Sequence, residues 1–536
     1  MSGEGRGRDL VTNALGRSVP LEVNGHEQLP YGGIGGRRPA GRKAAPPIAT
    51  AADYPANGDK RLRSLVEALE ACGLRDGMTV STHHHLRDGD LVANMLMDAC
   101  ARLGRRDLVW FPSAAFPCHA PMIEHMRRGV LHHVEGSMNG ALGDYCTEGR
   151  MRGLGVLRSH GGRWQAIQDG EVHVDLAVIA APCADPFGNA NGVDGPAACG
   201  SLGFALADSM YADRVVVVTD HVVPFPAVPW QIKGCHVDHV VQVERIGDPR
   251  RIVSGTTEIT RSPDRLLIAE LVARFVRDAG IMRNGFSFQA GAGGTALAFA
   301  IYLEDMMKRA GVKARFIRGG STRYLVEMLE AGLTDYILDG QTFDLAGVGS
   351  MRDNPRHVAT SPFTSYNFHG KGFFGTLVDV TVLGATEVDV DFNANVVTHS
   401  DGRLLHGIGG WQNCLFAGCT ILAVPAVRDR IPVIVDRVTT LTGPGELIDV
   451  VVTERGIAVN SRRQDLRDAV KGSGLPIRDI RDIQREVEQL CGGKPTPPRR
   501  GDRPVAVVKW VDGTLIDTIW KSERAGASHD ASEGDG

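Results

Sequence analysis

The segment VDLAVIAAPCADPFGNANG, residues 174–192, returns as VDVTVLGATEVDVDFNANV, residues 378–396, at an offset of 204 residues. Each copy begins with an apolar run rich in β-branched residues, which predicts a buried strand, and continues into a turn that carries an Asn-Ala-Asn triplet. Because both the strand and the turn are repeated, one structural unit is expected to occur twice in the chain.

Two further matches keep the same order along the chain. MTVS at 78–81 corresponds to FSFQ at 286–289 at an offset of 208, and VDHVVQVER at 237–245 corresponds to IDVVVTER at 448–455 at an offset of 211. Strand-like and helix-like runs alternate in both halves, which is typical of βαβ units and parallel sheets.

The repeats predict an α/β protein with two homologous domains, residues 56–262 and 263–520. We expect largely parallel sheets and two domains that face each other across a ligand-binding cleft. Residues 1–55 are rich in Gly, Arg and Pro and predict a flexible arm, and residues 521–536 predict a disordered tail.

The composition excludes several classes of function. With 59 Lys and Arg against 63 Asp and Glu, the net charge of -4 does not suit a nucleic-acid-binding or membrane-surface protein. No apolar run is long enough to span a bilayer, and the first ten residues do not resemble a signal peptide. Ten cysteines without a C-x-x-C pair predict reduced thiols in the cytoplasm and no metal site.

A first glycine loop lies in FSFQAGAGGTALAF, residues 286–299, between a predicted strand and a predicted helix. Gly291, Gly293 and Gly294 would let backbone N–H groups approach an anion at the positive end of that helix. The pattern also fits a dinucleotide fingerprint, and because Arg318 ends the next strand, an NADP site is the alternative.

A second glycine loop, HGIGGWQN at 406–413, is a candidate oxyanion hole. Acyl transfer passes through a tetrahedral centre whose negative oxygen is stabilised by fixed N–H donors, and Gly409 and Gly410 permit a close approach of the backbone. A tight structural turn is the alternative for this loop.

Histidines and arginines follow the predicted strand at 78–81 and also occur in SHGGR at 159–163. Because neighbouring strand residues point to opposite faces, the run of three histidines at 83–85 is not expected to converge on a metal. We expect these side chains to bind carboxylates instead.

Taken together, the motifs resemble the citrate lyase alpha chain from about residue 58 to residue 518. The motifs that carry this resemblance are His83-His84, Arg87, Gly89-Asp90, CHAPMIEH at 118–125, SHGGR at 159–163, FGNANG at 187–192, GAGG at 291–294, FNANV at 392–396 and GIAVN at 456–460. The resemblance implies the CoA-transferase fold in both domains.

The resemblance also implies an activity and its partners. A chain of this family exchanges acetate for citrate on the thiol of an acyl carrier protein, the gamma chain, and a beta chain then cleaves the citryl thioester. The thiol belongs to a CoA-derived prosthetic group of the carrier, or to CoA itself, so this chain would hold no cofactor. We expect a homo-oligomer within a larger complex.

The expected site combines both glycine loops with polar side chains of both domains. The catalytic residues would be Gly293, Gly294, Gly409 and Gly410. The substrate-binding residues would be His83, His84, Arg87, His160, Arg163, Gly291, Gly319, Gly320, Ser321, Asn393 and Asn395.

The second glycine loop departs from the family pattern. The family continues as Gly-Gly-His-x-Asp, whereas Trp411-Gln412-Asn413 follows here, which suggests an altered acyl pocket. Covalent CoA-transferases carry a glutamate after the strand that follows the first glycine-loop helix, where this chain has Gly319-Gly320. The nearest acid, Glu327, is expected on an exposed helix face. Direct attack by citrate through a mixed anhydride is therefore expected.

Two alternatives share the fold. One is another thioester enzyme, such as a general CoA-transferase, an acyl-CoA hydrolase or the transferase subunit of malonate decarboxylase. The other is a non-catalytic ligand-binding relative.

Overall fold

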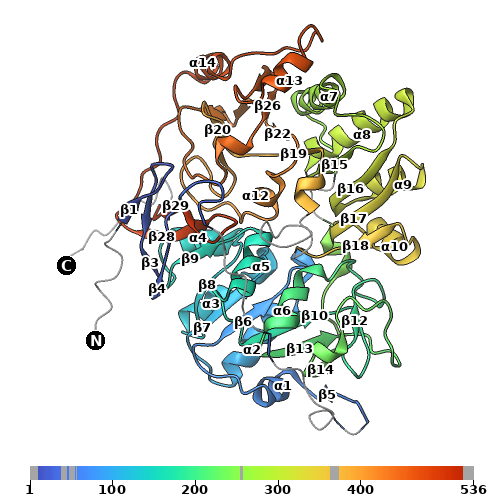
Figure 1. Ribbon diagram of the computed structural model, residues 1–536. Coiled ribbons are helices and arrows are strands. Elements are labelled where there is room, and N and C mark those ends of the chain that lie inside the picture. The colour runs from blue at the N-terminus through green and yellow to red at the C-terminus, as the bar shows by residue number, and fades with distance from the viewer. Residues whose placement is uncertain are drawn as a thin grey trace, which may run out of the picture.

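The computed structural model describes residues 10–37, 45–46, 55, 57–253, 258–291, 293–362 and 374–522. Two large sheets dominate it, one in the lower half of Figure 1 and one in the upper right. The first, in spatial order, consists of β5 (Arg61–Leu62), β14 (His239–Gln242), β13 (Arg214–Thr219), β10 (Leu176–Ala180), β6 (Thr79–Thr82), β7 (Leu108–Pro112) and β8 (Leu131–Val134), all parallel.

The second sheet is also parallel except at one edge. Its order is β18 (His357–Ala359), β17 (Thr334–Thr342), β16 (Ala314–Ser321), β15 (Ser287–Ala290), β19 (Val380–Leu383), β22 (Thr420–Ala423), β26 (Val450–Thr453) and β27 (Gly456–Val459), of which only β27 is antiparallel to its neighbour. Several central strands, such as β10 and β22, are buried along their whole length, as expected when helices cover both faces.

The two sheets have the same topology. The order β14-β13-β10-β6-β7-β8 in the first is repeated as β26-β22-β19-β15-β16-β17 in the second. The three sequence matches fall on the pairs β6 and β15, β10 and β19, and β14 and β26. The predicted α/β fold with two homologous, largely parallel domains is therefore confirmed.

Helices connect and cover the strands of each domain. Those of the first half are α1 (Leu65–Ala71), α2 (Val92–Arg102), α3 (Met122–Arg127), α4 (Ala141–Thr147), α5 (His160–Asp169) and α6 (Leu206–Tyr211). Those of the second half are α7 (Pro263–Asp278), α8 (Gly294–Ala310), α9 (Arg323–Glu330), α10 (Leu345–Asp353), α12 (Trp411–Cys414), α13 (Gln464–Ala469) and α14 (Ile480–Cys491). No helix in the described ranges is long and apolar enough to cross a membrane.

The repeated Asn-Ala-Asn turns have a structural role that the duplication preserves. In the first domain, Asn189 donates to Asp185 (2.8 Å) and accepts from the backbone N–H of Gly234 (2.9 Å). In the second, Asn393 donates to Asp389 (3.1 Å), and its oxygen again accepts from a glycine N–H. Because the antiparallel ladders that flank these turns are only two residue pairs long, the amide side chains supply further hydrogen bonds that close the turns.

The N-terminal segment is ordered from residue 10 to residue 37, although the sequence predicted a flexible arm there. It forms the hairpins β1 (Leu10–Thr12) with β2 (Ser18–Pro20) and β3 (Glu22–Val23) with β4 (His26–Glu27). The hairpins are held because Val19 and Val23 are buried in a small core with Leu515. Residues 1–9, 38–44 and most of 47–56 lie outside the described part.

The C-terminal strands β28 (Pro504–Lys509) and β29 (Leu515–Trp520) extend back to the first domain, although the sequence assigned them to the second. β28 pairs in parallel with β9 (Gly155–Leu157). Figure 1 shows this sheet beside the N-terminal hairpins, at the left of the molecule. The two ends of the chain therefore brace the junction between the domains. Of the expected disordered tail, residues 521–536, the first two are described, and the N–H of Ser522 donates to the backbone oxygen of Thr147 at 3.1 Å; the rest lies outside the described part.

A substitution at Trp510 tests whether the packing of the two chain ends stabilises the fold. It is 1% exposed, and its ring meets Tyr31 edge-on at 5.9 Å between centroids. Trp510→Ala is expected to lower the free energy of unfolding by about 3–5 kcal/mol, since it removes a large buried ring. Chemical denaturation measures the change.

The matched control is Trp230→Ala, because Trp230 is 52% exposed. Its effect should stay within about 0.5 kcal/mol. Equal losses in the two variants would show that the brace at Trp510 does not stabilise the fold.

Candidate active site

The carboxyl ends of the two large sheets meet, and the predicted site residues gather mainly at this junction. His84 follows β6, and its Nε2 lies 3.2 Å from Oε1 of Gln341, at the end of β17. The Gln341 amide in turn donates to the backbone oxygen of His84 at 3.4 Å. Figure 1 shows α5 and α12 beside this junction. Ligands of parallel α/β sheets characteristically bind at this edge.

Three rings form the centre of the site. The centroid of the His84 ring lies 5.2 Å from that of His160 and 4.4 Å from that of Phe204, and Phe204 lies 4.5 Å from His160. Burial lowers the pKa of His84 well below its usual value, and burial together with the charge of Arg163 lowers the pKa of His160 to about 3. Both imidazoles are therefore neutral at physiological pH, so they offer hydrogen bonds rather than positive charge.

His160 begins helix α5 directly opposite the second glycine loop. Its backbone N–H donates to the oxygen of Gly409 at 2.8 Å, and the next N–H, of Gly161, donates to Oδ1 of Asn413 at 3.1 Å. Ser159 caps the same helix end by accepting from its third residue. The turn of the glycine loop is thus fixed against a helix of the other domain.

The N–H groups of this loop are available as donors. Those of Gly409 and Gly410 donate to no acceptor within the described ranges. A Cβ atom at Gly409 would lie 3.9 Å from Nε2 of His160, and φ is +62°, so a glycine is favoured here. Two N–H groups without an acceptor in the described residues, next to a neutral histidine, are what an oxyanion hole requires.

Arg87 is the buried cation of the site. Its guanidinium lies 5.2 Å from the Phe116 ring and 4.7 Å from the Phe343 ring, and burial lowers its pKa to about 10. It therefore remains charged at neutral pH. Its backbone has φ +51°, an uncommon conformation for arginine that costs about 1–3 kcal/mol and concentrates at functional sites.

The last residues of β16 leave no place for a side chain at the two glycines. A Cβ atom at Gly320 would lie 1.7 Å from the Phe343 ring, and at Gly319 it would lie 3.1 Å from Gln289, with φ +111°. The Ser321 hydroxyl donates to Asp339 at 2.5 Å and is buried. Gly319 and Gly320 are therefore spacers, and Ser321 is held inside the sheet rather than offered to a ligand.

The first glycine loop borders the same sheet edge. Gly291 follows β15, whose last residue pairs with Gly319. Gly293 has φ +148° with open space around its Cβ position, and Gly294 approaches Thr260, whose nitrogen would lie 2.7 Å from a Cβ atom. Gly293 is thus the open position of the pair, while Gly294 is required for packing.

His83 and Arg163, predicted to bind substrate, belong instead to a buried network beneath the site. Arg163 donates to Asp208 and to Ser81, each at 2.7 Å, and His83 Nε2 lies 3.1 Å from Asp208. Burial alone would raise the pKa of Asp208, but Arg163 and His83 hold it well below its usual range. Because Asp208 neutralises the guanidinium, we place Arg163 and His83 outside the ligand site.

Asn393 and Asn395 are also used within the fold. The Asn395 amide donates to Glu387 at 3.0 Å and to Thr398, and its oxygen accepts the N–H of Thr398 at 3.1 Å. Asn393 closes the turn described above. Their groups are engaged in turns, so we place both outside the ligand site.

The residues that replace the family's His-x-Asp have structural partners. Trp411 Nε1 donates to the oxygen of Gly384 at 2.8 Å, and its ring packs against Gly443. Gln412 donates to the backbone oxygen of Lys509 at 3.0 Å, which joins the loop to the C-terminal hairpin. Trp411 is therefore packed into the protein, and its ring does not reshape the space beside His160.

Several residues of the site escaped the sequence analysis. They are Phe116, Phe204, Gln289, Gln341 and Phe343, which come from separate loops and strand ends. Gln289 lies within the first glycine-loop segment but was not singled out, and the others belong to no motif, because aromatic and amide residues are common throughout the chain. Only their contacts with Arg87, His84 and Gly319 show that they belong together.

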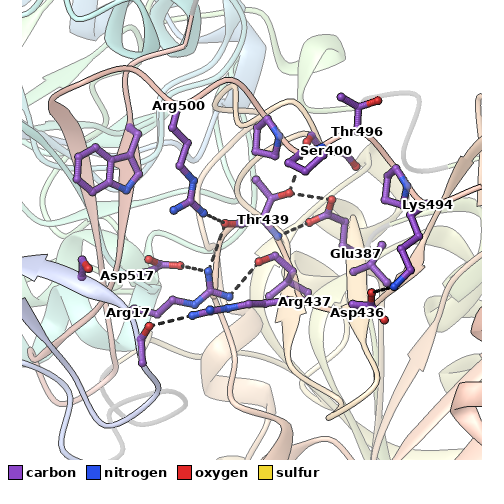
Figure 2. A pocket seen from close by; sticks show the side chains of 18 of the residues that line it. Arg17, Glu387, Ser400, Asp436, Arg437, Thr439, Lys494, Thr496, Arg500 and Asp517 are labelled. Carbon is purple, nitrogen blue, oxygen red and sulfur yellow. Dashed lines mark hydrogen bonds and ion pairs between the residues drawn. The ribbon is translucent and has the colours of Figure 1, made fainter.

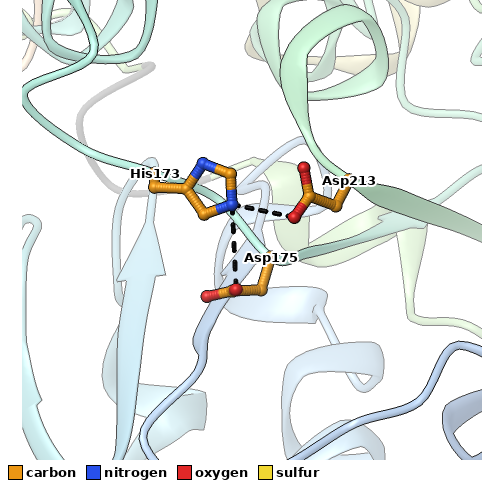
Figure 3. A group of neighbouring side chains, drawn as sticks. All are labelled: His173, Asp175 and Asp213. Carbon is orange, nitrogen blue, oxygen red and sulfur yellow. Dashed lines mark hydrogen bonds and ion pairs between the residues drawn. The ribbon is translucent and has the colours of Figure 1, made fainter. Parts of the chain in front are cut away.

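One group in the described chain has the geometry of a metal site, and it lies elsewhere. His173 Nε2 is 2.8 Å from Asp213 and 3.8 Å from Asp175, on the surface (Figure 3). These residues precede β10 and β13, so they lie at the amino edge of the sheet, opposite to the candidate site. We assign no role in the chemistry to this group.

Duplicated parallel sheets that meet at their carboxyl edges, with glycine loops on the second sheet, define a CoA-transferase-like α/β protein. The family model described as "Citrate lyase, alpha subunit (CitF)" matches residues 58–522. The citrate lyase alpha chain of Klebsiella pneumoniae is 42% identical over 468 residues, which cover 86% of this chain and 92% of that protein. The Escherichia coli citrate lyase alpha chain is 40% identical over 464 residues, with coverages of 86% and 91%.

Comparison with solved structures points to the same family. A structure described as the alpha subunit of citrate lyase from Streptococcus mutans, in complex with citrate, has a TM-score of 0.88 and 38% identity, and the match covers 96% of this chain and 100% of that one. A Pseudomonas malonate decarboxylase hetero-tetramer, with a TM-score of 0.60 and 18% identity, covers 82% of this chain and 95% of its own and shares the fold. The chain belongs to the citrate lyase alpha-subunit family, the citrate CoA-transferase subunits of a multi-subunit lyase.

The neutral histidines predict a loss of stability in acid. The pKa of His160 in the folded protein, about 3, lies below that of an unfolded histidine, about 6.5. The unfolded chain therefore binds an extra proton between these values, and stability falls as the pH decreases through that window. His160→Gln should reduce the loss of unfolding free energy between about pH 6.5 and about pH 5 by ~2 kcal/mol, measured by denaturation.

His26→Gln is the control, because His26 is exposed. If His160→Gln and the control show the same pH dependence as the unchanged protein, the pKa of His160 is not lowered in the folded protein.

Proposed function

We propose that this chain exchanges acyl groups on a thioester, accepting citrate and releasing acetate. The observation that carries this proposal is the pair of N–H donors at Gly409 and Gly410 beside the neutral ring of His160. Family membership supports citrate as the acceptor, since a relative with 38% identity was solved in complex with citrate.

The chemistry would proceed in two exchanges. A carboxylate oxygen of citrate attacks the carbonyl carbon of the acetyl thioester, and the C–S bond breaks. The thiolate departs as the leaving group, and a mixed anhydride of citrate and acetate is formed. The thiolate then attacks the citryl carbonyl, and acetate leaves with the electrons of the broken C–O bond. Each attack creates an oxyanion, which the Gly409 and Gly410 N–H groups would stabilise.

The protein would supply no covalent nucleophile. At Gly319 and Gly320, where covalent relatives carry a glutamate, Phe343 and Gln289 fill the space that a side chain would need. Glu327 pairs with Arg323 at 3.6 Å on the surface of α9, where its side chain is 55% exposed. Citrate and the thioester would therefore bind together, which also brings the reacting groups into proximity.

The remaining residues would bind the substrates. Arg87 would pair with a citrate carboxylate and His160 would donate a hydrogen bond to it, while the ring of His84, whose nitrogens contact Ser113 and Gln341, would line the site beside them. Gly291 and Gly293, at the positive end of α8, would face the carrier thioester.

The thioester would be carried by the CoA-derived prosthetic group of a gamma acyl carrier protein, or by CoA. A beta chain would cleave the citryl thioester, and the assembly would contain several copies of this chain in the cytoplasm. All ten cysteines are free, in keeping with a reducing compartment.

The purified chain is expected to convert an acetyl thioester and citrate into citryl thioester and acetate with sequential kinetics. Because no carboxylate occupies the nucleophile position, the acetyl thioester alone should leave no adduct on the protein. Steady-state kinetics and intact-protein mass spectrometry measure the two properties.

The two measurements separate two failures. Turnover with a borohydride-reducible glutamyl thioester would keep the activity and overturn the direct mechanism. Absence of turnover with citrate, in the presence of an acetylated carrier, would overturn the proposed activity.

Gly409→Ala is expected to lower kcat at least about 100-fold, because its methyl group would enter the space between the loop donors and His160. Initial-rate kinetics measures the loss. Gly472→Ala is the matched control, since Gly472 also has a positive φ, +80°, but nothing lies within 4 Å of its Cβ position. Both variants carry similar backbone strain, so an equal loss of activity would show that strain, not the site, is responsible.

A further inference from the structure

A cavity of about 640 Å³ lies away from the candidate active site. Its walls come from the N-terminal hairpin around Arg17, the loop 435–439 of the second domain, and the C-terminal segment 494–520 (Figure 2). No residue of the junction around His84 and His160 lines it. Its volume is within the usual range for small-molecule sites.

Three guanidinium groups converge in this cavity. Arg17 and Arg500 donate to the backbone oxygen of Thr439 at 3.5 and 3.3 Å, and Arg437 donates to the backbone oxygen of Gly16 at 2.9 Å. Figure 2 shows the groups of Arg17 and Arg437 side by side, with Arg500 above them. Backbone carbonyls orient them but do not neutralise their charge.

Four carboxylates, those of Glu387, Asp436, Glu488 and Asp517, line the cavity and equal its Arg and Lys side chains in number, but they do not contact every guanidinium group. Asp517 lies 3.4 Å from Arg17, and Lys494 pairs with Asp436. Arg437 and Arg500 contact no carboxylate in the described residues. Burial lowers the pKa of Arg17, and the charges of Arg437 and Arg500 lower it further, against the opposing effect of Asp517. Such mutual repulsion is relieved when an anion binds.

Besides its charged groups, the cavity is lined by hydroxyl side chains, those of Ser18, Ser400, Thr439 and Thr496, and by apolar ones. Trp520 is half-buried on the wall, and Pro495, Pro497 and Pro498 follow the rim. A planar ring can pack against an indole while a charged group attached to it reaches the arginines. Guanidinium forks match phosphate oxygens in geometry as well as in charge.

We propose that this cavity binds a nucleotide, with its phosphates on Arg17, Arg437 and Arg500 and its base against Trp520. The ligand would contact the N-terminal hairpin, the second domain and the C-terminal strand at once. Its binding would therefore stabilise the brace that supports the active-site junction, at a site that is separate from the citrate and thioester sites.

Isothermal titration calorimetry of the full chain with ADP, inorganic pyrophosphate and citrate tests the proposal. ADP should bind once per chain and more tightly than pyrophosphate. Arg437→Gln with Arg500→Gln should weaken ADP binding at least about tenfold, because two charge-assisted contacts are lost. Trp520→Leu should weaken ADP binding and leave pyrophosphate binding unchanged.

Arg462→Gln with Arg481→Gln is the matched control, because both arginines are 61% exposed, line another cavity, and give the same change in charge. This double variant should bind ADP normally. The proposal is overturned if no ADP binds at millimolar concentration, if both double variants lose binding equally, if pyrophosphate binds as tightly as ADP, or if citrate displaces ADP from the unchanged protein.

Discussion

The hydrogen bond from the His160 N–H to the Gly409 oxygen is the contact on which the site depends. It joins the first turn of a helix in one domain to the glycine loop of the other, and the N–H of Gly161 adds a second bond to Asn413. The loop is fixed by its carbonyl and side-chain groups, and the N–H groups of Gly409 and Gly410 have no acceptor in the described residues. Pre-oriented donors of this kind stabilise a developing oxyanion without reorganisation during the reaction.

Buried ion pairs next to the site stabilise this junction. Arg163 is neutralised by Asp208, and Arg158 pairs with Glu135 at 2.5 Å and with Glu171 at 3.0 Å. Arg158 and Arg163 lie on either side of His160 in the sequence, so these ion pairs fix the backbone from which His160 projects. Removing one partner from such a pair would leave an uncompensated charge, which costs more than the pair contributes.

The two ends of the chain complete the support. The C-terminal hairpin pairs with β9, just before α5, and its Lys509 oxygen accepts from Gln412 in the loop. The N-terminal hairpins pack on the same strands. One buried hydrophobic cluster contains residues of both domains and of the C-terminal hairpin, such as Val178, Leu422 and Trp510. This hairpin therefore extends the core that the two domains share.

The sequence by itself determined the duplicated α/β fold, because buried parallel strands require apolar, β-branched runs whose spacing survives in both copies. It also indicated the glycine loops, since close backbone approach excludes side chains. It did not distinguish Arg87 from Arg163, which occur in similar Gly-rich turns; only the tertiary structure pairs Arg163 with Asp208 and places Arg87 between Phe116 and Phe343. The site's aromatic and amide residues, and the ordered N-terminal hairpins, depend on contacts between segments hundreds of residues apart. Such contacts have no local pattern, because they are selected by shape and charge across an interface rather than by the period of a helix or strand.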